Sequence, residues 1–220
     1  MNRTELKQVY TQLLDHFGPQ QWWPADTPFE VLVGAILTQN TAWNNVEKAI
    51  ANLSQAGLLE SQALAEVETD KLEGLIRPSG YYRQKAARLL SITRLLCAQY
   101  DSDVVQLCNG TLEEARKRLL SLHGIGEETA DAILLYAAER PSFVVDAYTR
   151  RLFSRLGILS GTEGYAQIRS LFMEELPHEV KLFNEYHALI VIHCKEFCRK
   201  QNPHCMSCPL NTSCPSVNTI

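Results

Sequence analysis

The chain has 220 residues, of which 45% are hydrophobic, so it can bury the core of one large domain or of two smaller ones. No apolar run follows a basic start and no stretch of about eighteen apolar residues occurs. We therefore expect no signal peptide, no membrane span and a cytoplasmic protein, associated with the nucleoid if the source is bacterial. The formal net charge of −4 disfavours nucleic acid as a partner, because Lys and Arg supply most of the affinity for phosphate.

Basic residues nevertheless gather in short clusters, each of which is by itself typical of a solvated helix face. The clusters are Arg77, Arg83, Lys85 and Arg88; residues 116–118; Arg150, Arg151 and Arg155; and Lys195, Arg199 and Lys200.

Hydrophobic periodicity predicts an almost entirely helical chain. Apolar residues at helical spacing from Leu6 to Phe17 predict a first amphipathic helix. Thr27 followed by Pro28 and Glu30 is a strong helix start, and Thr111 begins a similar pattern. Further helices are expected at about 43–55, 70–76, 82–100, 112–120, 128–139, 147–156, 164–176 and 181–200, and only residues 143–145 look extended.

The three tryptophans of the chain lie close together in sequence, in Trp22-Trp23-Pro24 and at Trp43, after Gln39-Asn40-Thr41. Indole faces stack on planar rings, and a cationic purine over such a face gains about 0.5 to 2 kcal/mol. Packing in the core is the alternative for any one of them, but the clustering disfavours it for all three.

A glycine turn and an aspartate follow in the second half of the chain. Leu122-His123-Gly124-Ile125-Gly126 lies between two predicted helices, where the glycines allow backbone amides to approach a phosphate, although such a turn is often only a connection. Asp146 ends the apolar segment Phe143–Val145, where a partly desolvated carboxylate can stabilise developing positive charge. Capping of the next helix is the alternative role, and the two roles are compatible.

Four cysteines near the C-terminus have the spacing C-x6-C-x2-C-x5-C. Four thiolates this close in sequence suit one 4Fe-4S cluster, and structural zinc is the alternative, although its sites usually pair two short arms. The predicted ligands are Cys198, Cys205, Cys208 and Cys214. Cys97, Cys108 and Cys194 remain as expected buried thiols, and Cys194 could face the cluster from one helical turn before Cys198.

This cysteine spacing resembles that of the endonuclease III branch of the helix-hairpin-helix DNA glycosylases. Residues 119–130 resemble the hairpin that holds the DNA backbone in that superfamily, often with a bound monovalent cation, and Val145-Asp146 with Arg151 resembles its catalytic V-D-x-x-x-x-R motif. The resemblance implies an all-α, two-lobed fold with a C-terminal iron-sulfur cluster loop. The expected domains are 26–133, and 1–25 joined to 134–220.

The same resemblance implies site residues and partners. Asp146 is expected to be catalytic, and the partner is double-stranded DNA that contains a damaged base, bound by a monomer. Residues expected to contact DNA are Gln39, Asn40, Leu122, His123, Gly124, Ile125, Gly126, Arg150, Arg199 and Lys200, with a second wedge at Ser79–Arg83. His123 stands where relatives often have proline.

One departure from the family pattern predicts the reaction type. Endonuclease III itself has a lysine in the second helix of the hairpin that forms a Schiff base with the sugar, and this chain has Glu128 at that position. A carboxylate cannot form an imine. We therefore expect a monofunctional glycosylase that uses water and leaves the abasic strand intact.

The tryptophan segments resemble those of the 3-methyladenine DNA glycosylases of this branch, which also have an acidic residue where Glu128 stands. This resemblance implies alkylated purines such as 3-methyladenine or 7-methylguanine as substrates. Trp23 and Trp43 would stack on the base, Trp22 and Pro24 would shape the pocket, and Glu128 would make polar contacts. Gln39 or Asn40 would fill the gap that the extruded nucleotide leaves.

Two alternatives remain open from the sequence. A mismatch-directed thymine, uracil or adenine glycosylase would also lack the lysine, and Glu128 could then protonate the leaving base. A non-catalytic iron-sulfur DNA-binding module would need the hairpin but not Asp146.

Overall fold

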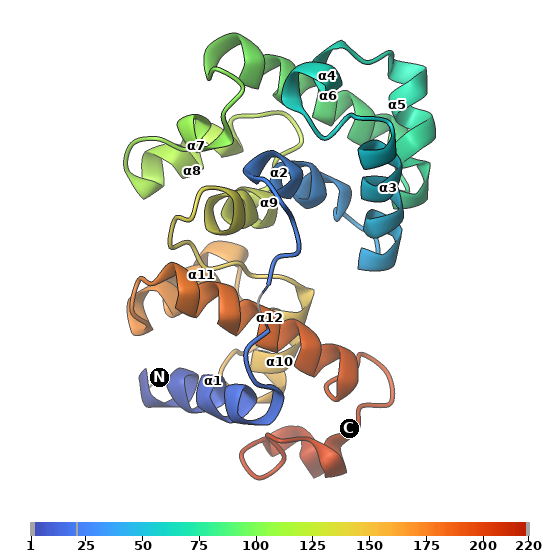
Figure 1. Ribbon diagram of the computed structural model, residues 1–220. Coiled ribbons are helices and arrows are strands. Elements are labelled where there is room, and N and C mark those ends of the chain that lie inside the picture. The colour runs from blue at the N-terminus through green and yellow to red at the C-terminus, as the bar shows by residue number, and fades with distance from the viewer. Residues whose placement is uncertain (1–2, 21, 219–220) are drawn as a thin grey trace. The chain divides into compact units, whose positions relative to one another are not determined.

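Helix is the only regular secondary structure in the part of the chain that the computed structural model describes, residues 3–20 and 22–218 (Figure 1). The predicted all-α fold is confirmed. This chain forms two compact units, one of residues up to Pro24 together with those from Pro141 onward, and one of Ala25–Arg140. Among the described residues, no helix combines the length and apolar character needed to cross a membrane.

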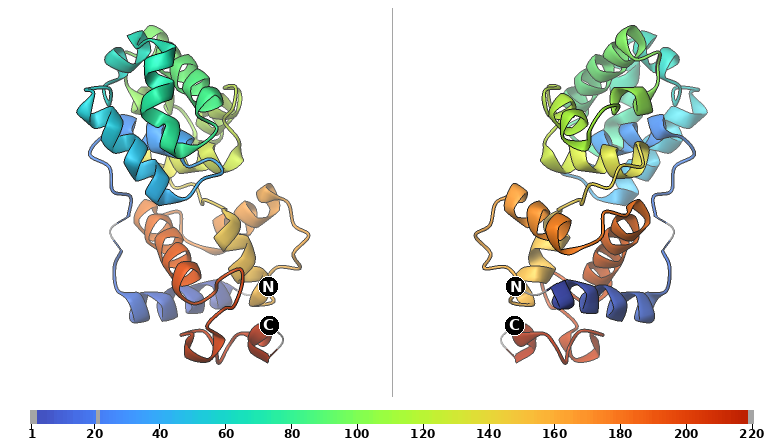
Figure 2. Two further views of the ribbon diagram at one scale, coloured as in Figure 1. Left: turned by 90° about the vertical axis from the view of Figure 1, so that its right-hand side faces the viewer. Right: turned by 90° about the vertical axis from the view of Figure 1, so that its left-hand side faces the viewer.

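The Ala25–Arg140 unit packs its helices around α2. The segments are α2 (Pro28–Leu37), α3 (Trp43–Gln55), α4 (Ser61–Glu66), α5 (Thr69–Ile76), the 3-10 turn η1 (Arg77–Ser79), α6 (Tyr82–Gln99), α7 (Val104–Leu107), α8 (Leu112–Leu120), α9 (Glu127–Ala132) and the π-helical turn η2 (Ile133–Ala137). Helix α6 packs along α4 and α5, as both views in Figure 2 show.

Helix α2 is the centre of this unit because nearly all of its side chains are buried. Thr27 is its N-cap and accepts a hydrogen bond from the amide of Glu30 at 3.1 Å, while Pro28 occupies the first turn. The helix packs against α3, α6, α9 and η2. The start of α2 predicted from Thr27 and Pro28 is thus confirmed.

Helix α8 begins with the second predicted cap. The Thr111 hydroxyl accepts from the amide of Glu114 at 3.3 Å, and the Glu114 carboxylate accepts from the amide of Thr111 at 2.8 Å. This reciprocal capping box fixes the start of the first helix of the hairpin.

The second unit is built on an aromatic core. Its segments are α1 (Arg3–Phe17), α10 (Ala147–Arg155), α11 (Tyr165–Glu175), α12 (Val180–Glu196) and the 3-10 turns η3 (Cys205–Ser207) and η4 (Pro215–Asn218). Phe143 stacks on Phe172 at 3.9 Å between ring centroids, and the buried Tyr186 hydroxyl donates to the carbonyl of Leu6 at 2.7 Å. This bond joins α12 to the N-terminal helix.

Two short helices were not predicted, and one predicted helix is divided. Helices α4 and α7 were missed, and the helix expected over 128–139 consists of α9 followed by η2, ending at Ala137. The Ala25–Arg140 unit, for which the sequence predicted residues 26–133, includes η2, which packs against α2. Residues 143–145, which were expected to be extended, form neither a helix nor a strand.

Candidate functional site

Asp146 is held by the start of helix α10. The buried segment Phe143–Val145 leads into Asp146. The backbone of Asp146 is extended, with φ −103° and ψ −175°. Its Oδ1 accepts hydrogen bonds from the amide of Thr149 at 2.7 Å and from the Thr149 hydroxyl at 2.9 Å. The carboxylate is therefore an N-cap, and its Oδ2 remains for other contacts.

Oδ2 of Asp146 faces His187, which sequence reasoning missed. His187 Nε2 lies 3.5 Å away, and the Asp146 side chain is only 13% exposed. Burial by itself would raise the pKa of Asp146, but the contact with His187 and the hydrogen bonds from Thr149 outweigh it and hold the pKa below its usual value. Asp146 is therefore an ionised, largely buried carboxylate at neutral pH.

The arginines after Asp146 tie α10 to its surroundings. Arg151 lies over the ring of Tyr148, 5.0 Å from its centroid, and donates to the carbonyl of Cys198 at 2.8 Å. The buried Cys194 thiol, expected from the sequence to be a core thiol, contacts the carbonyl of Tyr148 at 3.6 Å. Arg150, expected at DNA, donates to the carbonyl of Glu163 at 2.8 Å.

Three members of the predicted base pocket belong to the same compact unit as Asp146. Trp22 and Trp23 are half-buried with ring centroids 6.1 Å apart at 73°, and Pro24 is exposed. The ammonium of Lys195 on α12 lies 5.9 Å from the Trp22 ring, an arrangement that the sequence did not predict. Trp43 belongs to the Ala25–Arg140 unit, where its indole donates to Glu47 at 2.8 Å.

The predicted hairpin lies between α8 and α9 in the Ala25–Arg140 unit. Gly124 has φ +83°, and a Cβ there would collide with the side chain of Arg88, so glycine is required. His123 is exposed and Ile125 is buried, while Gly126 caps α9. Backbone amides at this turn and at the start of α9 suit the binding of a phosphate group.

Gln39 is part of the support of this hairpin. Its amide nitrogen donates to the carbonyl of Gly124 at 3.1 Å and to the Thr129 hydroxyl at 3.0 Å, and its oxygen accepts from Arg88. Asn40, the next residue, is exposed in the left-handed conformation with φ 54°. Of the two residues predicted to enter DNA, Asn40 therefore has the more accessible side chain.

Charged residues fix the two hairpin helices to each other. The guanidinium of Arg116 on α8 contacts the fully buried carboxylate of Asp131 on α9 at 2.9 Å and that of Glu127 at 3.3 Å. Glu128 is exposed in the first turn of α9. No amine is attached at this position, so the residue cannot form the imine of a lyase reaction.

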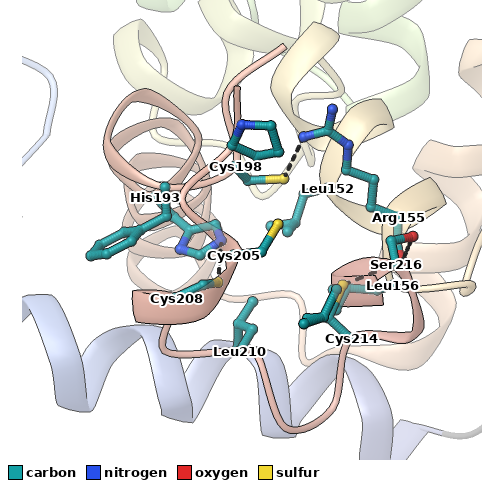
Figure 3. Close-up of a pocket in the computed structure, with 13 residues that line it drawn as sticks. Leu152, Arg155, Leu156, His193, Cys198, Cys205, Cys208, Leu210, Cys214 and Ser216 are labelled. Carbon is teal, nitrogen blue, oxygen red and sulfur yellow. Dashed lines mark hydrogen bonds between the residues drawn. The ribbon is translucent and has the colours of Figure 1, made fainter. Parts of the chain in front are cut away.

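The four predicted cysteine ligands line one pocket (Figure 3). Cys198 follows α12, Cys205 begins η3, and Cys208 and Cys214 lie in the loop that follows. The apolar side chains of the lining are Leu152, Leu156, Phe197, Pro203, Leu210 and Val217.

Two nitrogen groups reach the sulfur atoms of this pocket. Arg155 donates to Cys198 Sγ at 3.3 Å, and His193 Nε2 lies 3.7 Å from Cys208 Sγ. The hydrogen bond with Cys194 and the charge of Arg155 lower the pKa of Cys198 below its usual value, which favours a thiolate. Burial lowers the pKa of His193 to about 4, so its ring is neutral.

This donor set can hold an iron-sulfur cluster. Among the described residues, no group of three His, Cys, Asp or Glu side chains is placed to hold a metal ion. The pocket nevertheless has four cysteines in its lining, which is the ligand number of a thiolate-bound 4Fe-4S cluster. Arg199 and Lys200, predicted to face DNA, are exposed beside this pocket.

Known DNA repair proteins are similar to this chain in sequence. Residues 33–178 match HhH-GPD, the superfamily of base excision DNA repair proteins. The chain is 50% identical over 210 residues to a Methanocaldococcus jannaschii protein named as a candidate DNA repair glycosylase, an alignment that covers 94% of each chain.

Two solved structures are similar over most of the chain. Endonuclease III in a trapped covalent intermediate with DNA superposes with a TM-score of 0.85 at 22% identity, covering 99% of this chain and 98% of that one. The 3-methyladenine DNA glycosylase MagIII of H. pylori, bound to 1,N6-ethenoadenine, gives a TM-score of 0.75 at 30% identity, covering 89% of this chain and 98% of that one.

Proposed function

The chain belongs to the HhH-GPD superfamily of base excision DNA repair proteins, and from this premise we propose that it is a monofunctional glycosylase for alkylated purines in DNA. Its membership makes it an endonuclease III-like DNA glycosylase. The proposal adds two points, which are the class of base that is removed and the absence of a lyase step.

The observation that carries the proposal is the ionised, largely buried carboxylate of Asp146. Cleavage of a glycosidic bond develops positive charge on the sugar, and a fixed negative charge in a poorly solvated site stabilises that transition state. A purine alkylated at N3 or N7 already carries positive charge, so it leaves without a general acid. The site then needs Asp146, a stacking surface and water.

Two further observations support this substrate class. The half-buried indoles of Trp22 and Trp23 offer aromatic faces in the same compact unit as Asp146, and such faces favour a cationic ring. MagIII, a 3-methyladenine DNA glycosylase, is 30% identical to this chain. Pro24 follows these two indoles in the same unit, and the roles of Trp43 and Glu128 at the base stay predictions from the sequence.

Hydrolysis without strand cleavage follows from Glu128. The carboxylate cannot attack the sugar to give an imine, so the attacking group is water, oriented by Asp146. We propose that one 4Fe-4S cluster, held by Cys198, Cys205, Cys208 and Cys214, supplies a cross-link for the C-terminal loop. No step of bond cleavage passes through the cluster.

The test is base release from methylated duplex DNA, resolved by chromatography, with wild type and Asp146→Asn. Asparagine caps helices as well as aspartate does, so this change removes the charge and preserves the start of α10. We expect wild type to release 3-methyladenine or 7-methylguanine and the variant to lose at least about 100-fold in rate.

The matched control is Asp103→Asn. Asp103 caps α7 through a 2.7 Å bond from the amide of Val105, so this variant carries the same chemical change away from the site. It should release bases at the wild-type rate. Release by wild type from T:G, U:G or A:8-oxoguanine duplexes, without release of alkylpurines, would instead identify a mismatch glycosylase. An unchanged rate in Asp146→Asn would remove the catalytic role.

A further inference from the structure

Lys85 on α6 is a buried lysine whose partners are two backbone carbonyls. The residue is 1% exposed, and its ammonium donates to the carbonyl of Leu37 at 2.8 Å and to that of Ser79 at 2.6 Å. Burial of a cation is costly unless strong hydrogen bonds offset it. Burial and the nearby charge of Arg88 lower the pKa of Lys85 to about 8, and a neutral amine would still have two N–H donors for the two carbonyls.

Each of the two carbonyls belongs to the last residue of a helical segment, and an exposed turn follows each segment. Leu37 is the last residue of α2, and Ser79 is the last residue of η1. The α2–α3 turn (residues 38–42) presents Asn40 with φ 54°, and the η1–α6 turn (residues 80–81) presents Tyr81 with φ 46°. Lys85 therefore links two turns that lie far apart in sequence and that each carry an exposed residue in the left-handed conformation.

The composition of these turns suits DNA bases and phosphates. Tyr81 is 65% exposed and is the most exposed large hydrophobic residue of the Ala25–Arg140 unit. The guanidinium groups of Arg77 and Arg83 lie 5.8 and 5.9 Å from the ring of Tyr82, beside it. Aromatic faces with flanking arginines are a common surface for unstacked bases.

We propose that Lys85 is a positioning residue that holds the α2–α3 turn and the η1–α6 turn at a fixed spacing, so that Asn40 and Tyr81 enter the duplex together when a nucleotide is extruded. The inference rests on the proposed DNA glycosylase function. Extrusion breaks base pairing and stacking, and two tips held as one rigid unit replace the lost contacts without further ordering. Gln39 anchors the same α2–α3 turn to the hairpin, so the turn is fixed from two sides.

The first test reads extrusion without chemistry. A duplex carries 2-aminopurine beside an abasic-site analogue, and its fluorescence rises when binding unstacks it. We expect Lys85→Met to bind this duplex but to lose at least about fivefold of the fluorescence rise. The control is Leu89→Ala, which removes a fully buried side chain one turn further along α6 and bonds neither turn. It should lower the thermal midpoint and keep the signal.

A second test does not depend on the folding of Lys85→Met. If the two tips act as one unit, the effects of Asn40→Ala and Tyr81→Ala on the fluorescence rise will be non-additive, with the double variant little worse than either single one. Additive effects, or an equal loss in Leu89→Ala, would overturn the inference. A wild-type protein that unstacks the probe but releases no alkylpurine would contradict the proposed substrate and leave the role of Lys85 standing.

Discussion

Asp146 combines two tasks in one side chain. Oδ1 caps α10 through Thr149, while Oδ2 faces His187, so the hydrogen bonds that start the helix also favour the ionised form. The carboxylate that we propose as catalytic is thereby positioned by the start of a helix and by a buried neighbour. The same arrangement makes Asp146→Asn an informative substitution, because it separates charge from capping.

Glu128 provides a gain-of-function test at the residue scale. Glu128→Lys places an amine in the first turn of α9, where lyases of the superfamily form an imine with the sugar. We expect wild type to give no borohydride-trapped DNA adduct and the variant to give one, measured as a shifted band on a denaturing gel.

Glu113→Lys is the control for this variant, because it makes the same charge change on α8. An adduct with Glu113→Lys would show that added positive charge alone causes trapping. An adduct with wild type would contradict the monofunctional mechanism.

Lys85 shows what the sequence could not reveal about single residues. Its neighbours Arg77, Arg83 and Arg88 make it part of a basic cluster that predicts a solvated helix face, and for Lys85 this expectation is wrong. Arg88 likewise turns inward to Gln39. Charge clustering is a property of sequence, whereas the carbonyls that accept from Lys85 are brought together only by the folding of α2 and η1 around α6.

At the scale of elements, the sequence predicted the helix starts that are capped by a side-chain hydrogen bond. Thr27 and Thr111 each mark a helix start because a side-chain oxygen satisfies an amide of the first turn. Helix α4 has no such signal, since its N-cap Glu60 makes no side-chain bond, and α7 has only four residues. Packing against neighbours, α6 in the case of α4, stabilises these short helices and leaves no periodic pattern.

In the candidate site, too, residues within short sequence motifs were predicted and residues brought together only by folding were not. Asp146, the hairpin and the cysteines each form a short motif, so the sequence alone could identify them. His187 was missed because it lies on α12, 41 positions from Asp146 along the chain (187 − 146), in no recognisable pattern. The hydrogen bonds of Gln39 depend on the same kind of long-range approach, in which the α2–α3 turn meets the hairpin.

The hairpin carries a prediction at this scale. Arg116 on α8 holds the buried carboxylate of Asp131 on α9, and removal of one partner of a buried pair leaves an uncompensated charge. We expect Arg116→Met to lower the free energy of unfolding by about 3–5 kcal/mol in urea. Affinity for DNA should fall as well, because the hairpin amides lose their alignment.

Arg118→Met is the control for the hairpin prediction. Arg118 lies on the same helix and bonds the carbonyls of Leu107 and Asn109 with no buried carboxylate. It should cost clearly less stability than Arg116→Met. Equal losses in the two variants would show that the ion pair does not hold the hairpin together.

At the scale of the whole molecule, the cysteine pocket lies outside the part of the chain that matches the superfamily. That match ends at residue 178, whereas the cysteines run from Cys198 to Cys214. The pocket is nevertheless joined to helix α10 by two hydrogen bonds: Arg151 donates to the carbonyl of Cys198, and Arg155 donates to its sulfur. Both arginines are on α10, the helix that Asp146 caps.

This connection predicts how the molecule responds to loss of the cluster. Metal analysis of the purified protein should give about four iron atoms per chain, and Cys208→Ser should lose most of them. Without the cross-link, α10 and the C-terminal loop lose a common anchor. The thermal midpoint should therefore fall by at least about 5 °C. For a chain of this size, a loss of about 1 kcal/mol corresponds to roughly 2–4 °C, so the expected loss exceeds that amount.

The control is Cys97→Ser, a substitution of a half-buried thiol outside the pocket, which should leave the iron content and the midpoint unchanged. If the analysis finds one zinc and no iron per chain, the site is a structural zinc site and not a cluster. An unchanged midpoint in Cys208→Ser would show that the loop needs no anchor.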